Sequence, residues 1–151
     1  MENTMKLRYA ITLLLCLLLS ACSLSDRFSA VAFHQLTLLQ ARSTRFLQDA
    51  ARIPWPKETL IKDDHDIRQT FFQAERFARQ RGDKRRLDNL TLLKNHYLRF
   101  YARVMAHKQP LTYIQAERYQ QQNNQAWKLA IQGECLRWGA RCIQGDENGV
   151  Y

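Results

Sequence analysis

The stretch that decides the fold is residues 84–108, KRRLDNLTLLKNHYLRFYARVMAHK. Its apolar side chains recur every three or four residues, or at sums of those steps. An α-helix turns once in about 3.6 residues, so this spacing places them on one face. The stretch therefore predicts a long amphipathic helix whose apolar face packs against other helices. Those side chains are Leu87, Leu90, Leu93, Tyr97, Phe100, Tyr101 and Val104.

Three further stretches show the same helical spacing of apolar residues. They run from about Asp26 to Ala51, from Lys57 to Arg81, and from Thr112 to about Trp138. Prolines and the Gly82-Asp83 pair separate them, because proline interrupts a helix and glycine followed by aspartate ends one helix and caps the next. The alternation typical of strands is nearly absent. The sequence predicts an all-α, up-down-up-down four-helix bundle, with a pair of helical hairpins or a swapped dimer as alternatives.

The N-terminus has the layout of a secretory signal peptide. Lys6 and Arg8 precede an apolar run, Tyr9–Leu19, and small residues follow it. The run is about half of the ~20 residues that a membrane-spanning helix needs. It leads into Leu19-Ser20-Ala21-Cys22, which resembles the lipobox of bacterial lipoproteins, in which the cysteine is lipidated and becomes the mature N-terminus.

This resemblance implies a location and a mode of attachment. Cys22 is expected to carry a thioether-linked diacylglycerol and an amide-linked fatty acid such as palmitate, and two chains already anchor a protein stably. Ser23 after the cysteine implies sorting to the outer membrane of a Gram-negative bacterium, with the domain facing the periplasm. The expected organisation is a cleaved signal peptide (1–21), a lipidated tether (22–26), a helical bundle (27–142) and a flexible C-terminal tail (143–151).

Processing divides the four cysteines. Cys16 leaves with the signal peptide and Cys22 takes lipid, so Cys135 and Cys142 remain. Two thiols in the oxidising periplasm predict a disulfide. In an unbroken helix their Cα atoms would lie ~10.5 Å apart, whereas a disulfide needs less than about 7 Å, so the helix must end between them, at Gly139. A zinc pair or a redox site is the alternative, and either one favours closer spacing.

The chain is strongly basic. Its net charge is +9, and loss of residues 1–21 leaves 21 basic and 13 acidic side chains. Anionic phospholipid, lipopolysaccharide, peptidoglycan or an acidic protein fits this charge, while export argues against nucleic acid. Six cations gather at the second predicted turn and form a candidate site for an anionic partner; the alternative is a soluble turn with favourable charge at a helix C-terminus. They are Arg76, Arg79, Arg81, Lys84, Arg85 and Arg86.

Other polar clusters predict no metal site, cofactor or catalytic centre. Residues 62–66, KDDHD, concentrate possible ligands, but consecutive helical residues point about 100° apart, and a solvated helix start explains them better. The histidines are scattered, and Glu-x-x-His pairs of the di-iron kind do not occur. Neither a nucleophile elbow nor a phosphate-binding loop is present. The amides of residues 120–125, QQQNNQ, either hydrogen-bond a peptide, a glycan or another helix, or form an exposed helical face.

Taken together, these features favour binding over catalysis. We expect a non-enzymatic accessory or scaffold subunit that is anchored in the outer membrane and binds an envelope protein complex. Two alternatives are open: recognition of peptidoglycan or lipopolysaccharide by the basic turn, and inhibition of a periplasmic toxin or hydrolase.

Overall fold

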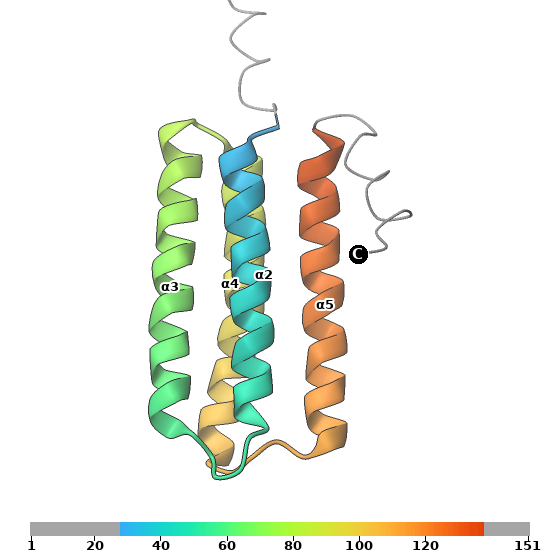
Figure 1. The fold of residues 1–151 in the computed structure, drawn as a ribbon. Helices are drawn as coiled ribbons and strands as arrows, with labels where there is room; N and C mark the ends of the chain where they lie inside the picture. The colour runs from blue at the N-terminus through green and yellow to red at the C-terminus, as the bar shows by residue number, and fades with distance from the viewer. Residues whose placement is uncertain (1–27, 138–151) are drawn as a thin grey trace, which may run out of the picture.

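The protein is an all-α four-helix bundle (Figure 1). The structure, a computed structural model, describes residues 28–137. Its helices are α2 (Ala30–Ala50), α3 (Lys57–Gln80), α4 (Lys84–His107) and α5 (Tyr113–Leu136), and the described residues contain no strand. Consecutive helices run in opposite directions, and α5 returns beside α2 (Figure 1). The predicted up-down-up-down bundle is confirmed.

The helix ends follow the local signals in the sequence. Gly82 has a φ of 63° and closes α3, with the Asp83 N–H donating to the Ala78 carbonyl at 3.0 Å. Asp83 then caps α4 by accepting from the Arg86 N–H at 3.0 Å. Thr112 and Gln115 form a reciprocal capping box at the start of α5. The predicted helix boundaries at Gly82-Asp83 and at Thr112 are therefore confirmed.

The first helix is shorter than predicted. Ser29 is its N-cap, with an extended backbone and a hydroxyl that accepts from the Ala32 N–H at 3.4 Å. A helix cannot continue through an N-cap residue, so α2 begins at Ala30 and the predicted start at Asp26 is wrong. At the other end of the chain, α5 is described as far as Leu136, while Trp138 lies outside the described residues.

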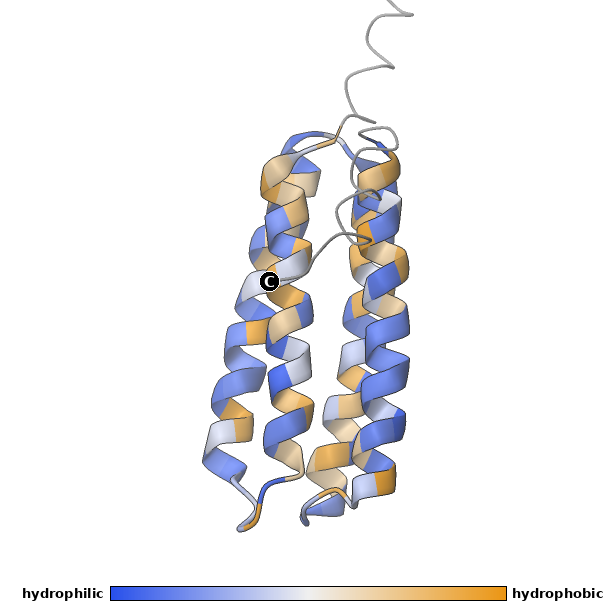
Figure 2. Cartoon of the chain, turned by 45° about the vertical axis from the view of Figure 1, so that its right-hand side comes forward, coloured by the Kyte–Doolittle hydropathy of each residue, from blue (hydrophilic) through white to orange (hydrophobic). Residues whose placement is uncertain are grey.

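Aromatic side chains from all four helices meet in the core. Phe46 of α2, Phe71 of α3, Tyr97 of α4 and Trp127 of α5 are all buried. The ring centroids of Phe71 and Trp127 lie 6.1 Å apart, and those of Phe46 and Tyr97 lie 5.6 Å apart. Figure 2 shows apolar positions interleaved with polar ones along the helices, as expected for helices with one buried face.

The topology gives the bundle two different ends. The basic end holds the start of α2, the α3–α4 turn and the end of α5 (Figure 1). The distal end holds the α2–α3 loop, residues 51–56, and the α4–α5 loop, residues 108–112. The two distal loops are joined by the Leu111 N–H, which donates to the Ala50 carbonyl at 2.9 Å. Among residues 28–137, no helix is long and apolar enough to cross a membrane.

Candidate functional site

Five of the six cations predicted as an anion-binding set are exposed together at the basic end. They come from the last turns of α3, the α3–α4 turn and the first residues of α4. The guanidinium of Arg81 lies 4.7 Å from the centroid of the Phe77 ring, so an aromatic face supports it. We call these five residues the basic tip: Arg76, Arg79, Arg81, Lys84 and Arg85.

Arg86, the sixth predicted member, does not belong to the basic tip. It is only 5% exposed, and its Nη2 lies 2.6 Å from Oε1 of Glu134 on α5. Its Nη1 lies 2.6 Å from Oδ2 of Asp83. Arg86 points inward because Glu134, 48 residues later in the chain, provides a buried carboxylate for it. The expectation that Arg86 contacts an external anion is wrong.

Arg86 is part of a buried charge cluster, which we define as Asp83, Arg86, Glu134 and Arg137. Nη1 of Arg137 lies 2.6 Å from Oδ2 of Asp83, and both side chains are almost completely buried. The Ser29 N–H donates to Oε1 of Glu134 at 3.3 Å, so the start of α2 is tied to the same cluster. Two positive and two negative groups balance one another here. The cluster joins three segments of the chain at the basic end.

The pKa of Asp83 reflects this environment. Burial raises it, but the hydrogen bond from Arg137, the backbone N–H of Arg86 and both guanidinium charges lower it by more. The net result is a pKa below the ordinary value for aspartate. Asp83 is therefore ionised at neutral pH, and its charge favours the folded state.

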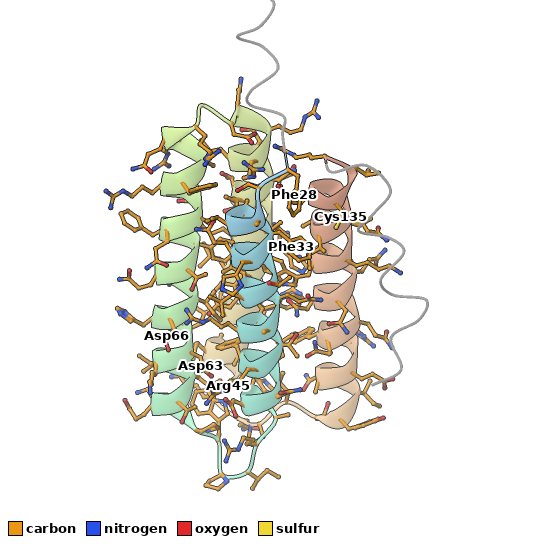
Figure 3. All side chains as sticks on the ribbon, turned by 45° about the horizontal axis from the view of Figure 1, so that its top comes forward. Phe28, Phe33, Arg45, Asp63, Asp66 and Cys135 are labelled. Atoms are coloured by element: carbon orange, nitrogen blue, oxygen red, sulfur yellow. The ribbon has the colours of Figure 1, made fainter. Side chains whose placement is uncertain are left out.

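The predicted lipid and disulfide positions fall largely outside the described residues. Cys22 lies there, and so does Cys142. Cys135 is described and is buried on the last turn of α5. Figure 3 shows it near the end of the bundle that also carries Phe28 and Phe33. Lipidation of Cys22 and the Cys135–Cys142 bond remain predictions.

A groove runs between α4 and α5, and we call it the α4–α5 groove. Two adjoining hollows of about 470 and 380 Å³ share Asn89, Leu93 and Ala130 in their walls. Two large apolar side chains in the wall are mostly exposed, Leu92 at 68% and Leu129 at 64%. The smaller hollow is mainly apolar, whereas polar and charged side chains such as Asn89 and Glu134 also line the larger one. Exposed apolar side chains gathered in a groove are typical of a surface that binds a partner.

The groove exists because α5 presents small side chains to α4. Ala126, Ala130 and Gly133 recur at steps of four and three residues and line the hollows. Side chains of this size do not fill the space between two helix backbones that larger residues hold apart elsewhere. This spacing is the sequence signal from which the groove could have been predicted.

One histidine, His96, lies in the wall of the groove. Its Nε2 is buried without a hydrogen-bond partner among the described residues. Burial, and then the positive charge of Arg99, lower the pKa of His96, so the ring is neutral at pH 7. The ring also packs edge-on against Phe100, with centroids 4.6 Å apart. His96 thus contributes a neutral imidazole to the wall of the groove, with its Nε2 atom covered by the protein.

The acidic residues of segment 62–66 separate into different environments. Asp64 is buried and accepts from Nε of Arg68 at 2.8 Å and from the Tyr97 hydroxyl at 2.9 Å. Asp63 lies toward α2, where burial and the neighbouring Asp49 carboxyl raise its pKa. The predicted solvated helix start is therefore wrong for Asp64. No group of three or more metal-ligating side chains that could hold an ion occurs in the described part of the chain.

Asp63 and Asp66 also border a small hollow between α2 and α3. It measures about 130 Å³, and arginines from α2 form its opposite wall (Figure 3). Arg42 donates to the Asp66 carbonyl at 2.9 Å and to the Thr70 hydroxyl. These arginine contacts connect α2 to α3 near the distal end.

The amide run of α5 is partly internal. Asn123 is buried and accepts from Nε1 of Trp127 at 3.0 Å, and its own amide donates to Thr44 at 3.4 Å. Gln120 also donates to Thr44, at 3.2 Å. The predicted bonding of these amides to another helix is therefore confirmed for Gln120 and Asn123, and residues 120–125 are not a wholly exposed face.

Comparison with known proteins adds no assignment: no family model, no curated protein and no solved structure matches this chain. The functional argument therefore rests on two surfaces, the basic tip and the α4–α5 groove. The basic tip was predicted from the sequence. The burial of Arg86 was not, because no residue near it in the sequence indicates it.

Proposed function

We propose that this protein is an outer-membrane lipoprotein that faces the periplasm and acts as a non-catalytic accessory subunit. In this proposal, lipid on Cys22 holds the bundle at the membrane, and the α4–α5 groove binds an amphipathic helix of an envelope protein complex. The lipobox resemblance supports the anchor. The groove supports the binding role.

The observation that carries the proposal is the exposure of leucines inside a concave surface. Leu92 and Leu129 stand on opposite sides of the groove, on α4 and α5. Full burial of one such side chain contributes about 1.5–3 kcal/mol, so a partner that covers both gains substantially. Scattered apolar residues on a surface need no explanation, but these two share one groove with Leu93 and Ala130.

The shape and charge of the groove indicate the kind of partner. Its residues on α5 run from Ala126 to Leu136, which corresponds to ~15 Å of helix, or about three turns. A helix of that length presents anchors at positions i, i+3 or i+4, and i+7 to such a groove. Arg99 lines the groove as well. We therefore infer a partner helix with an apolar stripe flanked by acidic residues.

The placement of the titratable groups supports a binding role. Among residues 28–137, the groups with shifted pKa values lie in four environments: Asp83 in the buried charge cluster, Asp63 beside Asp49, Tyr97 against Asp64, and His96 in the groove wall. The first three are engaged by neighbouring side chains of the bundle itself. Such contacts serve packing and charge balance rather than a shared reaction centre.

Site-specific photo-cross-linking in living cells tests the groove. A photoreactive amino acid replaces Leu129 in the groove, and a matched control replaces Phe72, which is 56% exposed on α3. We expect the Leu129 probe to cross-link to one segment of an envelope protein. Mass spectrometry should show that this segment is an amphipathic helix with acidic flanks. The same segment, added as a synthetic peptide, should compete with the cross-link.

Three results would contradict the proposal. Equal labelling from the Phe72 position would mean that the groove is not a specific surface. Cross-links confined to residues 138–151 of the same chain, or to a second copy of it, would give the groove a different occupant. Leu129→Asp should abolish the cross-link of a second probe at Leu92, and an unchanged yield would also count against a partner helix in the groove.

A further inference from the structure

We propose that the basic tip lies against anionic phospholipid headgroups of the membrane in which the protein is anchored. The tip thereby sets the orientation of the bundle, with the basic end toward the bilayer and the distal end away from it. This inference rests on the proposed lipid anchor and adds a second, electrostatic contact to it.

The first step is the position of the basic tip relative to the proposed anchor. The bundle topology places the α3–α4 turn at the same end as the start of α2 (Figure 1). Phe28 is the first described residue and follows Cys22 by six positions. Six residues span at most about 20 Å, so lipid on Cys22 would hold this end of the bundle close to the headgroups.

The second step is the net charge of the side chains that are exposed at the basic end. Asp83 and Glu134, the carboxylates buried at this end, are already matched by Arg86 and Arg137. The five side chains of the basic tip are exposed, and Asp88, one turn into α4, is an exposed carboxylate of the same region. The outer surface of the basic end therefore carries an excess of positive charge, which attracts an anionic bilayer over about one Debye length, ~8 Å in physiological salt.

The third step is the apolar surface beside these cations. Val31 and Leu136 are exposed at the same end of the bundle, and Arg81 rests on the ring of Phe77. Arginine and lysine beside apolar groups suit the membrane interface, where the charged head contacts phosphate and the stem lies on hydrocarbon. This combination favours a lipid surface over a hydrated polymer such as peptidoglycan.

Limited trypsin digestion on vesicles tests the contact with the unmodified chain. The protein is purified in detergent from membranes of a producing bacterium and reconstituted into vesicles of phosphatidylcholine, with or without phosphatidylglycerol. Cleavage after Arg81, in the α3–α4 turn, reports on the basic end. Cleavage after Lys108, in the α4–α5 loop, reports on the distal end of the same molecules.

We expect phosphatidylglycerol to slow cleavage after Arg81 about tenfold and to leave cleavage after Lys108 unchanged, because only the basic end contacts headgroups. High salt should remove this protection, since it screens exposed charges. Equal cleavage rates on both vesicle types would overturn the inference. So would protection of Lys108 in place of Arg81, or protection of Arg81 by purified peptidoglycan and not by vesicles.

Two double variants separate a charge effect from a general one. Arg76→Glu with Arg79→Glu keeps the cleavage site after Arg81 and should abolish its protection. Lys57→Glu with Lys62→Glu changes charge equally on the distal half of α3 and should leave the protection intact. Circular dichroism verifies that both variants keep the helical content of the parent protein.

Flotation of the vesicles distinguishes failure of this inference from failure of the anchor. A protein that floats with phosphatidylcholine vesicles, but is cleaved equally fast after Arg81 with or without phosphatidylglycerol, has its anchor and lacks the tip contact. A protein that floats only with phosphatidylglycerol vesicles has the tip contact and lacks the anchor. A protein that floats with neither contradicts both proposals.

Discussion

The two ends of the bundle differ in how their buried carboxylates are neutralised. At the basic end, Asp83 and Glu134 are buried with Arg86 and Arg137, and the four charges cancel. At the distal end, Asp49 and Asp63 face one another. The arginines that pair with Asp49 there, Arg45 at 3.6 Å and Arg52 at 3.1 Å, are mostly exposed to solvent. We infer that buried ion pairs stabilise the basic end, whereas burial and the neighbouring Asp49 disfavour the ionised form of Asp63 at the distal end.

The outer surfaces of the two ends also differ. The basic end presents the five cations of the basic tip, whereas the distal loops expose two, Arg52 and Lys108. The apolar side chains Ile53, Tyr113 and Ile114 are largely exposed at or beside these loops. This contrast supports the proposed orientation of the bundle. The basic end suits contact with an anionic membrane, and the distal end would then face away from the membrane.

Loss of Arg86 should have the largest effect on stability. Arg86→Ala leaves Glu134 buried without its closest cation, since Nε of Arg137 is 3.8 Å away. Breaking one side of a buried ion pair typically costs 3–5 kcal/mol, and we expect about 3 kcal/mol here because Arg137 remains. Urea unfolding followed by circular dichroism measures the change.

The matched control for Arg86 lies near the distal end. Arg52→Ala removes an arginine that also contacts an aspartate, Asp49, at 3.1 Å, but the Arg52 side chain is mostly exposed. An exposed pair contributes at most about 1 kcal/mol. Equal losses from the two variants would mean that burial of the charge cluster does not distinguish the ends.

The predicted Cys135–Cys142 disulfide would strengthen the same end. Such a small ring contributes roughly 2–3 kcal/mol to the free energy of unfolding. We expect digestion without reducing agent to yield the two cysteine peptides as one linked species, and reduction to lower the unfolding midpoint. Two separate thiol peptides from oxidised, freshly isolated protein would contradict the bond.

The carboxyl pair at the distal end should make stability depend on pH with an unusual sign. The pKa of Asp63 is raised in the folded protein, first by burial and then by Asp49, so the folded state holds its proton more tightly than the unfolded chain does. Stability contributed by that proton is present at low pH and is lost as pH rises above about 4 through the raised pKa. Asp63→Asn should therefore stabilise the protein at pH 7, by up to about 1 kcal/mol, and flatten this pH dependence.

Asp83 provides the opposite case at the basic end. Its pKa is lowered, so its contribution to stability is present at neutral pH and is lost as pH falls below about 4. Asp83→Asn should destabilise the protein at pH 7, and the difference from the parent should shrink in acid. If both asparagine variants shifted stability in the same direction at pH 7, the contrast between the two ends would fail.

The α4–α5 groove should show the smallest effect on folding. Leu129 is exposed, so Leu129→Asp should change the free energy of unfolding by less than about 0.5 kcal/mol. Its effect should instead be on partner binding. A large loss of stability, measured in the same urea titration, would mean that Leu129 supports the fold rather than a binding surface.

Much of the fold could be predicted from the sequence because local signals agree with the tertiary structure. The helical spacing in residues 84–108, the Gly82-Asp83 stop and the Thr112 cap each act within a few residues. These signals place α4 within one residue of its predicted end, at His107. They suffice for a bundle with short connections.

The candidate site was less predictable because it depends on contacts between distant segments. No neighbouring residue in the sequence distinguishes Arg86 from Arg85. Arg86 is buried because it pairs with the carboxylate of Glu134, which lies on another helix. The burial of Asn123 likewise depends on Thr44 of α2. The groove had a weak signal in the small residues of α5, but only the packing of two helices shows that the space beside them stays open.

The most direct test of this account is the mass of the mature N-terminal peptide, isolated from the membrane fraction. An anchored bundle whose basic end faces the bilayer requires that the peptide begin at Cys22 and carry diacylglycerol and a fatty acid. Cys22→Ser should then leave the protein without this modification and release it from the membrane. A mature chain that begins elsewhere, or an unmodified Cys22, would contradict the account.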